Sequence, residues 1–321
     1  MKKHSRIIFS YDYELSWGPW DKVPVEYIAT NVRKANSAAL LIIEAHKKYS
    51  IPSTWAIVGA ILDTKSSPKH IMNSTNRPES VKKQFSEFCD KVGESDELFK
   101  ADSRVVEQLA NNSLFEIGSH TYTHIYSLES SFEELNDDFL KFNGVYEDVI
   151  GGLPVSLVMP KNQITQESIS VTEINKFGVV RTNPDNWLYV QKERKKIQAT
   201  VVRVVRFLDS FFPIGELLNS KSAYTGGNCK YIVGQYFVRP YFGNRILRKI
   251  HLWRLQFGIR FCSFIGRECH LWSHPHNFGL DTKVAVQFLE LLLSDIDKLR
   301  KSDKVTVCNM HEVRGNNGSQ Q

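Results

Sequence analysis

Side chains that could hold a metal ion or move a proton follow two of the strands that the sequence predicts. Asp12 and Glu14 come directly after a short apolar run, and side chains alternate along an extended chain, so both point to one side. One carboxylate of such a pair can bind a metal and the other can accept a proton. His120 and His124 follow the strand-like run 114–118, and imidazoles four residues apart can reach one ion. Taken singly, each pattern also occurs as solvated surface or by chance.

A third cluster lies near the end of the chain, where His270, His274 and His276 fall within seven residues. In an extended strand His270, Trp272 and His274 share a face, so the three histidines cannot all serve one reaction. Pro275 restricts the residue before it to extended geometry and so fixes the direction of its side chain. A structural role, as a core histidine or a loop residue, is the alternative for His270 and His276.

Together these segments resemble the polysaccharide deacetylase (NodB-homology) family, and their order and spacing agree from about residue 6 to 313. That family has an aspartate base followed by an acidic metal ligand, then His-[Ser/Thr]-x-x-His, then a late histidine acid. The resemblance implies that Asp12 is the general base and His274 the general acid. It implies that Glu14, His120 and His124 hold a divalent metal ion, zinc. A subgroup found among bacterial surface-polysaccharide genes is similar around the motifs, which here read YDYELSWG at 11–18, TWAIVG at 54–59, EIGSH at 116–120 and HLWSHPHN at 270–277.

Two departures from the family pattern leave roles open. The usual Arg-x-Pro-Tyr-Gly motif should fall near 158–163, and its arginine is missing there. Lys161 or Arg181 could supply that charge, and the sequence does not choose between them. The similar run at 239–243 comes too late in the chain. Glu14 stands where many members have aspartate, which lengthens one ligand arm without changing its chemistry.

The expected function is that of a metal-dependent hydrolase that removes an N-acyl group from a sugar of a surface-polysaccharide or glycolipid precursor. The acyl group that we expect is N-acetyl. The metal would activate water, Asp12 would take its proton, and His274 would protonate the leaving amine. Residues beside the motifs are expected to bind substrate: Lys161, Asn162, Arg181, Trp17 and Trp272. Two alternatives stay open, a deformylase acting on a lipid-linked formamido sugar and a sugar-binding relative without catalysis. The sugar, its acyl group, its carrier and the oligomeric state are left undetermined.

The elements that must position these residues alternate between short β-branched runs and longer helical patterns, which implies parallel βαβ units. Strands are expected at 6–11, 51–61, 114–118, 155–159, 179–182, 200–208, 268–273 and 304–308. Helices are expected at 26–50, 103–111, 131–149, 166–176 and 282–301, with loop and short helices over 63–102. Ser131 and Glu134 have the spacing of a capping box. The resemblance implies an α/β fold, a distorted (β/α) barrel over 1–321 as a single domain, with the motifs at the carboxyl ends of strands.

The net charge of +6 is unevenly placed, because 217–267 contains no Asp or Glu but many Lys and Arg. We expect 190–267 to form a basic insertion or cap, and its partner to be anionic, such as the diphosphate of a nucleotide- or polyprenyl-linked sugar. The segment 245–261 could lie on a membrane surface. A solvated basic face is the alternative. Nucleic acid is not expected as a partner, because no zinc-finger, RRM or helix-turn-helix signature is present.

Cysteine usage and hydropathy bear on the compartment. The five cysteines are odd in number and form no CxxC pair, which is typical of reduced thiols in a cytosolic protein. The first apolar run is too short for a signal-peptide core, and no stretch reaches the roughly 18 apolar residues of a membrane span. We therefore expect a cytoplasmic protein, with peripheral contact at the inner membrane face through the basic segment 217–267.

Overall fold

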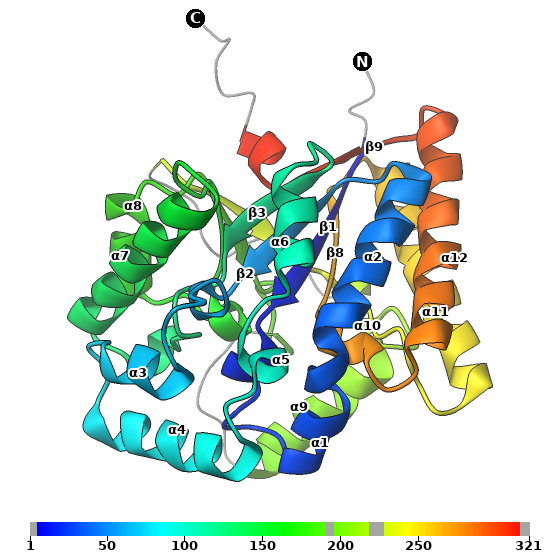
Figure 1. The fold of residues 1–321 in the computed structure, drawn as a ribbon. Helices are drawn as coiled ribbons and strands as arrows, with labels where there is room; N and C mark the ends of the chain where they lie inside the picture. Colours follow the sequence, from blue (N-terminus) through cyan, green and yellow to red (C-terminus); the bar gives the residue numbers. More distant parts are fainter. Residues whose placement is uncertain (1–4, 190–195, 218–227, 315–321) are drawn as a thin grey trace, which may run out of the picture.

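The computed structural model describes residues 5–189, 196–217 and 228–314. In it, helices surround one curled parallel sheet (Figure 1). Its strands are β1 (Ser5–Tyr13), β2 (Ser53–Ile57), β3 (Phe115–Ser119), β4 (Ser156–Val158), β5 (Val179–Thr182), β6 (Lys230–Val233), β7 (Tyr236–Phe237), β8 (Cys269–Ser273) and β9 (Val305–Cys308). Its helices are α1 (Val25–Thr30), α2 (Ala35–Tyr49), α3 (Pro68–Asn73), α4 (Glu79–Val92), α5 (Asp96–Phe99), α6 (Ser103–Ala110), α7 (Phe132–Val149), α8 (Gln166–Ile174), α9 (Lys196–Asp209), α10 (Ile214–Leu217), α11 (Arg245–Ile265) and α12 (Thr282–Lys301).

The strand order is β6-β5-β4-β3-β2-β1-β8-β7, and every pairing is parallel. The outermost strands, β6 and β7, are separated in the chain by only Gly234 and Gln235, so the sheet curls round into an open barrel. The predicted (β/α) barrel in a single domain is confirmed. Because all strands are parallel, their carboxyl ends lie at one end of the barrel, where such folds carry their sites.

β1 lies at the centre of the sheet and pairs with three strands. β8 follows it over Ile7–Tyr11, β9 over Ser5–Ile8, and β2 over Ser10–Tyr13. The stretch of β1 that pairs with β8 overlaps the stretches that pair with β9 and with β2. β8 therefore lies along one edge of β1, and β9 and β2 lie along the other edge, one beside each half of the strand. The strand that carries the first motif is therefore held along its whole length.

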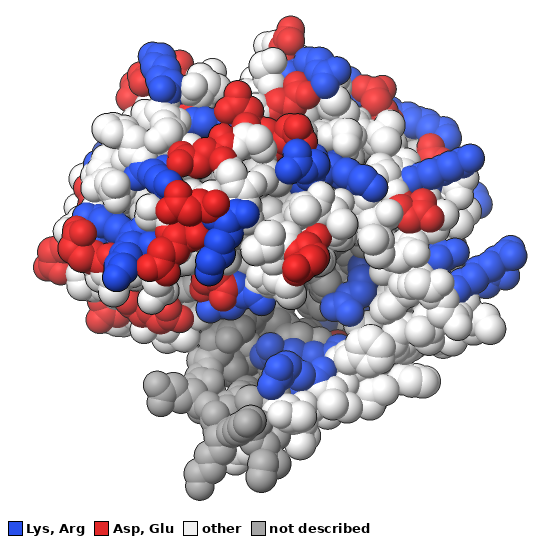
Figure 2. Space-filling model, turned by 60° about the horizontal axis from the view of Figure 1, so that its bottom comes forward, with Lys and Arg blue, Asp and Glu red and all other residues white. Residues whose placement is uncertain are grey.

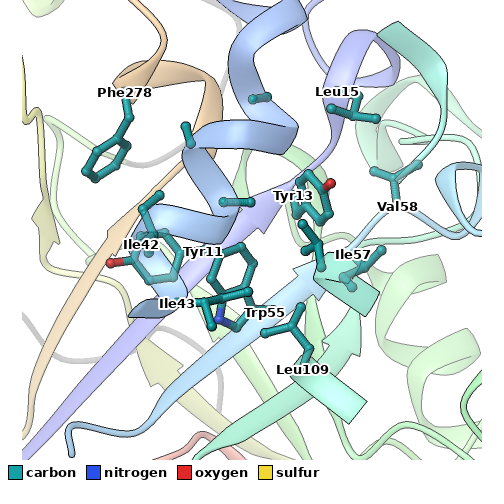
Figure 3. Close-up of a cluster of buried hydrophobic side chains, with 14 of the residues drawn as sticks. Tyr11, Tyr13, Leu15, Ile42, Ile43, Trp55, Ile57, Val58, Leu109 and Phe278 are labelled. Carbon is teal, nitrogen blue, oxygen red and sulfur yellow. The ribbon is translucent and has the colours of Figure 1, made fainter. Parts of the chain in front are cut away.

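Side chains of β1 divide between two environments. Tyr11 and Tyr13 point outward, and Figure 3 shows them with Trp55 beneath α2, whose Ile42 and Ile43 complete the layer. The alternate residues of β1 point into the barrel, where Ile8 joins a separate apolar cluster. This period of two therefore assigns packing to one face of β1 and chemistry to the other.

Most predicted elements are confirmed, including the strand 179–182 and the helix 282–301 at the predicted bounds. The capping box is also present, since Ser131 Oγ accepts from the Glu134 N–H and Glu134 Oε2 accepts from the Ser131 N–H. All five cysteines are buried, and none of them forms a disulfide. No helix in the described part of the chain is long and apolar enough to cross a bilayer.

Three expectations about elements are wrong. The predicted strand 200–208 lies in α9, where Val202 is buried while Val201 and Val204 face outward, so amphipathic packing overrides β-branched propensity. The predicted helix 26–50 is broken into α1 and α2. The stretch 63–102 contains the long helix α4, whose Phe85, Phe88 and Cys89 form a buried stripe.

The predicted basic segment 190–267 is only partly an insertion. Its residues 190–195 and 218–227 lie outside the described part of the chain, whereas β6 and β7 within it are strands of the barrel sheet. The helices within the described part of the segment are α9, α10 and α11.

Candidate active site

The three predicted motifs meet at the carboxyl end of the barrel. β1 carries Asp12 and is followed by Glu14, β3 is followed by His120, and β8 is followed by His274. These side chains line a cavity of about 240 Å³, together with His124, Tyr126, Lys161, Asn162, Arg181 and Trp272. Residues up to 262 positions apart in the chain therefore face one space.

Glu14, His120 and His124 form a buried group that could hold a metal ion, with their ligand atoms all within 4.8 Å of one another. Glu14 Oε2 lies 3.3 Å from His120 Nε2 and 3.1 Å from His124 Nε2. His120 Nδ1 lies 2.7 Å from the Val158 carbonyl oxygen, so this nitrogen carries the proton of the neutral ring. The unprotonated Nε2 then faces a carboxylate oxygen, and two acceptors this close require a cation between them.

The electrostatics of His120 agree with this need for positive charge. Burial alone would lower the pKa of His120, but the carboxylates of Glu14 and Asp12 outweigh burial and raise it. A proton or a divalent metal ion would each place positive charge between Glu14 and His120. Two imidazoles and one carboxylate are the donor set of an open catalytic zinc site, so these residues fit the predicted metal.

Gly18 makes room for the carboxylate of Glu14. A Cβ added at Gly18 would lie 2.1 Å from Glu14 Cδ and 2.4 Å from both carboxylate oxygens. Any larger residue at this position would push Glu14 away from the two histidines. Gly18 belongs to the motif at 11–18, but its place in the sequence gives no sign of this role.

The loop that carries the two histidines is conformationally strained. Thr121 and His124 both have positive φ, 64° and 57°, a region that costs side-chain-bearing residues about 1–3 kcal/mol each. Asp138 on α7 stabilises the loop by accepting bonds from the Tyr122 N–H at 2.5 Å and the Thr123 N–H at 3.0 Å. Sequence reasoning missed Asp138, although an acidic residue on the apolar stripe of its helix was a readable signal.

Asp12 is bound by Arg181 in a two-pronged ion pair, with distances of 2.8 and 2.6 Å, and both side chains are buried. Burial would raise the pKa of Asp12, but the adjacent guanidinium outweighs it, so the pKa is lowered. Arg181 also donates to Ser10 Oγ and Asn162 Oδ1, both at 2.9 Å. Through these bonds Arg181 positions Asp12, and since Arg181 also lines the cavity, its role in binding substrate stays a prediction.

The structure therefore chooses between the two candidates for the missing motif arginine. Arg181 comes from β5, one strand further along the sheet than β4, which precedes the expected position. Lys161 Nζ instead lies 3.3 Å from the centroid of the Tyr126 ring, and burial together with Lys22 lowers its pKa to about 8. Lys161 and Asn162 line the cavity with backbones of positive φ, 57° and 50°.

Of the three late histidines, only His274 lines the cavity. Its Nε2 lies 3.7 Å from both Asp12 Oδ2 and Glu14 Oε1. Asn277 Nδ2 lies 3.2 Å from His274 Nδ1, and if the amide donates this bond, the ring proton sits on Nε2 and points at the site. This geometry suits a proton donor.

The other two late histidines are buried, and His276 also lies beside the site, with its Nδ1 3.8 Å from Glu14 Oε1. The His276 ring stacks on the His274 ring at 4.8 Å, and burial lowers the pKa of His276 to about 3. His270 Nε2 is 2.8 Å from Ser10 Oγ, and burial lowers the pKa of His270 well below its usual value. The structural alternative for His270, inside the barrel wall, matches this placement.

The two predicted tryptophans differ. Trp272 lines the cavity, with the Arg181 guanidinium 4.5 Å from its ring centroid. Trp17 is fully buried, stacks on Phe85 at 4.8 Å and donates to the Phe99 carbonyl oxygen. Its prediction as a substrate-binding residue is therefore wrong, because Phe85 of the unpredicted helix α4 covers it.

The fold and the site define a parallel (β/α) barrel with a carboxylate–histidine group at the carboxyl ends of its strands. Residues 34–180 match the family model described as polysaccharide deacetylase. A proposed polysaccharide deacetylase from Mycobacterium smegmatis has a similar structure, with a TM-score of 0.61 and 12% identity over 98% of this chain and 90% of that one. At this identity the likeness shows the fold. The chain is therefore similar to polysaccharide deacetylases over residues 34–180, and it shares the fold of this solved relative.

Weaker structural likenesses include a CE4 family pseudoenzyme from Bacillus anthracis, with a TM-score of 0.47 and 13% identity over 98% of this chain and 66% of that one. Another is a family 4 acetyl xylan esterase from Clostridium thermocellum in complex with a cobalt ion, with a TM-score of 0.45 and 10% identity over 96% and 90%. Neither carries weight for the function of this chain. A search of curated proteins found no match.

Replacing Gly18 tests the predicted ligand role of Glu14. Gly18→Ala is expected to weaken binding of a divalent ion by about 10- to 100-fold, because the new Cβ displaces the carboxylate. Metal content after dialysis against a chelator measures this. Gly144→Ala on α7 is the control, since nothing lies within 4 Å of its added Cβ. Wild-type metal content in Gly18→Ala would show that Glu14 is not a ligand.

Replacing Arg181 tests its support of Asp12. Arg181→Met leaves a buried carboxylate without its counter-ion, so we expect about 3–5 kcal/mol less free energy of unfolding and a large loss of turnover. Arg181→Lys keeps the positive charge but cannot make the two parallel hydrogen bonds to Asp12, so it should lose less stability than Arg181→Met. Urea denaturation and kcat measure the two effects, with the exposed Arg203→Met as control. Unchanged stability and turnover in Arg181→Met would rule out this role.

Proposed function

We propose that this protein is a metal-dependent hydrolase that removes an N-acyl group, N-acetyl in the first instance, from a sugar. One observation carries the proposal: a group fit to hold a metal ion, a paired carboxylate and a histidine face the same cavity. The retention of all these groups favours a catalyst over a sugar-binding relative without activity.

Glu14, His120 and His124 are the residues that would hold the metal, for which we propose zinc. When bound, the ion would supply Lewis acidity, which lowers the pKa of water and polarises the amide carbonyl. The carboxylate and imidazole donors are all buried, so the charge that they hold would act in a site of low dielectric.

Asp12 and His274 are the residues that would move protons. Arg181 holds Asp12 ionised and fixes its orientation, so its carboxylate can take a proton from the attacking water. Nε2 of His274 lies 3.7 Å from Asp12 Oδ2, and the His274 side chain lines the same cavity. From there it would protonate the amine, which is a poor leaving group without that proton. The Trp272 ring beside it offers a flat surface for a pyranose.

A second cavity of about 330 Å³ adjoins the first and shares Lys161, Asn162 and Trp272 with it. Its wall carries Arg206, Arg239 and Arg254 against a single acid, Asp209, which pairs with Arg254 at 3.7 Å. Figure 2 views this end of the barrel and shows Lys and Arg side chains gathered in a hollow. We propose that the carrier of the sugar, a nucleotide or polyprenyl diphosphate of a surface-polysaccharide or glycolipid precursor, occupies this cavity.

Arg239 is the best-placed cation for such a carrier. Its guanidinium lies 5.6 Å from the Phe237 ring centroid and 5.7 Å from that of Phe242, and no acidic partner faces it among the described residues. Burial lowers the pKa of Arg239, which reflects a charge partly withdrawn from water without an anion to offset it. A phosphate in the cavity would supply that anion.

The choice of acid is tested with His274 and His276 variants. On an N-acetylated amide, His274→Ala should lower turnover by about 10²–10⁴-fold, and an activated aryl ester should be partly spared because it needs little protonation. His276→Ala is the control and should lose far less. Equal losses on amide and ester, or a larger loss in His276→Ala, would assign the acid role elsewhere. The released acid, acetate or formate, separates the deacetylase from a deformylase.

The carrier site is tested with Arg239→Leu. We expect KM to rise about tenfold or more for a diphosphate-linked N-acetyl sugar, since one charge-assisted hydrogen bond is lost, while kcat and the KM for the free sugar stay near wild type. Arg104→Leu on α6 is an exposed control far from the cavity in the fold. An equal change for linked and free sugars would contradict a carrier site at Arg239.

A further inference from the structure

An aromatic stripe runs along the outer face of α11. It consists of residues that are all exposed: Ile246, Trp253, Phe257, Phe261 and Phe264. Trp253 is 59% and Phe264 88% exposed, and the rings of Trp253, Phe257 and Phe261 stack in series, with centroids 5.8 and 6.2 Å apart. Their spacing by multiples of three, four and seven places them on one side of the helix. We call this set the α11 stripe.

The stripe is not needed to hold α11 in place. The opposite side of the helix is buried through Leu255, Gly258, Ile259 and Cys262. Gly258 lies so close to Tyr236 that an added Cβ would approach its ring to 2.6 Å. The helix therefore packs tightly on its inner face and leaves a continuous apolar face in water, which in a soluble domain marks an interaction site.

The charge beside the stripe identifies its partner. Arg245, Lys249 and Arg260 fall on one flank of α11, and the whole run 217–267 contains no acidic residue. Arg260 pairs with Asp295, while Arg245 and Lys249 are exposed and have no acidic partner in the part of the chain that the structure describes. An apolar face edged with unpaired cations is the composition of a helix that lies in a membrane interface.

We propose that the α11 stripe docks on a bilayer that carries anionic lipid. The docking proposal rests on the proposed function in one respect, namely that the substrate would then be a lipid-linked sugar. A second copy of the chain fits less well, because a two-fold interface would place the same basic flanks opposite each other. Anionic headgroups would instead neutralise Arg245 and Lys249 while the aromatic side chains enter the acyl boundary.

The docked helix would also bring the carrier cavity to the lipid surface. The inner side of α11 lines that cavity with His251, Arg254 and Leu255. His251 Nδ1 donates to the Ser210 carbonyl oxygen at 2.6 Å and so fixes α11 to the end of α9. α9 adds outward-facing apolar residues of its own, Val201, Val204, Phe207 and Leu208. A diphosphate at the lipid headgroup level could then reach Arg239 while its lipid tail stayed in the membrane.

Co-sedimentation of the full chain with vesicles tests the proposal. Binding is expected to phosphatidylcholine vesicles that contain phosphatidylglycerol, weaker binding to phosphatidylcholine alone, and loss of binding as salt rises. Phe257→Glu and Phe264→Glu should each reduce binding by about tenfold or more, since each removes a buried aromatic ring from the interface. Leu140→Glu, at an apolar position on α7 whose exposure lies between those of Phe257 and Phe264, should bind as wild type does.

Two further measurements keep docking separate from catalysis. Release of acid from a water-soluble N-acetyl sugar should be unchanged in Phe264→Glu, so loss of vesicle binding with retained activity supports docking alone. Failure of the wild type to bind anionic vesicles would overturn the docking proposal and leave the proposed function standing. A dimer in sedimentation equilibrium that Phe264→Glu dissociates would also overturn it, because the stripe would then cover a second copy.

Discussion

Burial of the Asp12 carboxylate at the end of β1 is the constraint on which the rest of this site depends. Removing an ion from water costs several kcal/mol unless a partner of opposite charge is held close to it. Arg181 meets that need with two bonds, and its other donors are fixed by Ser10 and Asn162. The pair therefore ties together β1, β5 and the turn after β4, and the Trp272 ring from β8 lies over the guanidinium.

The same strand solves a packing problem with its alternate residues. Tyr11 and Tyr13 fill the layer beneath α2, while Asp12 between them faces the barrel interior. A shift of the β1 register by one residue would bury the tyrosines where the carboxylate belongs and expose the carboxylate to the apolar layer. Pairing with three strands prevents that shift, so the stability of the sheet and the position of the base have one cause.

The sequence was most informative where residues close in the chain act together. Spacing drew attention to Glu14, His120 and His124, the family resemblance gave them their roles, and alternation located the parallel strands, because these signals are local. Arg181 could not be chosen over Lys161, since that choice depends on which neighbouring strand reaches Asp12 across the sheet. Trp17 was misplaced for the same reason, because the side chain that covers it comes from a helix far along the chain.

Errors in the elements follow from propensity that tertiary packing overrides. The valines of α9 favour a strand locally, yet in the structure only one side of the helix is covered and its outer valines face water. The strained loop at Thr121 and His124 could not be anticipated from spacing either, because its conformation depends on Asp138 from the next helix. Both cases show that the partner of a segment, and not the segment itself, decides its conformation.

The central place of β1 in the sheet has a consequence for the order in which the molecule can form during synthesis. Its edges are completed by β8 and β9, which come last in the chain among the described strands, and the counter-ion of Asp12 emerges 169 residues after it. Until then the nascent chain exposes an apolar strand with an open edge and an unpaired carboxylate. Folding that depends on such distant pairings is slow, and early intermediates with free strand edges are prone to aggregate. β1 is thus made well before the strands that complete its edges.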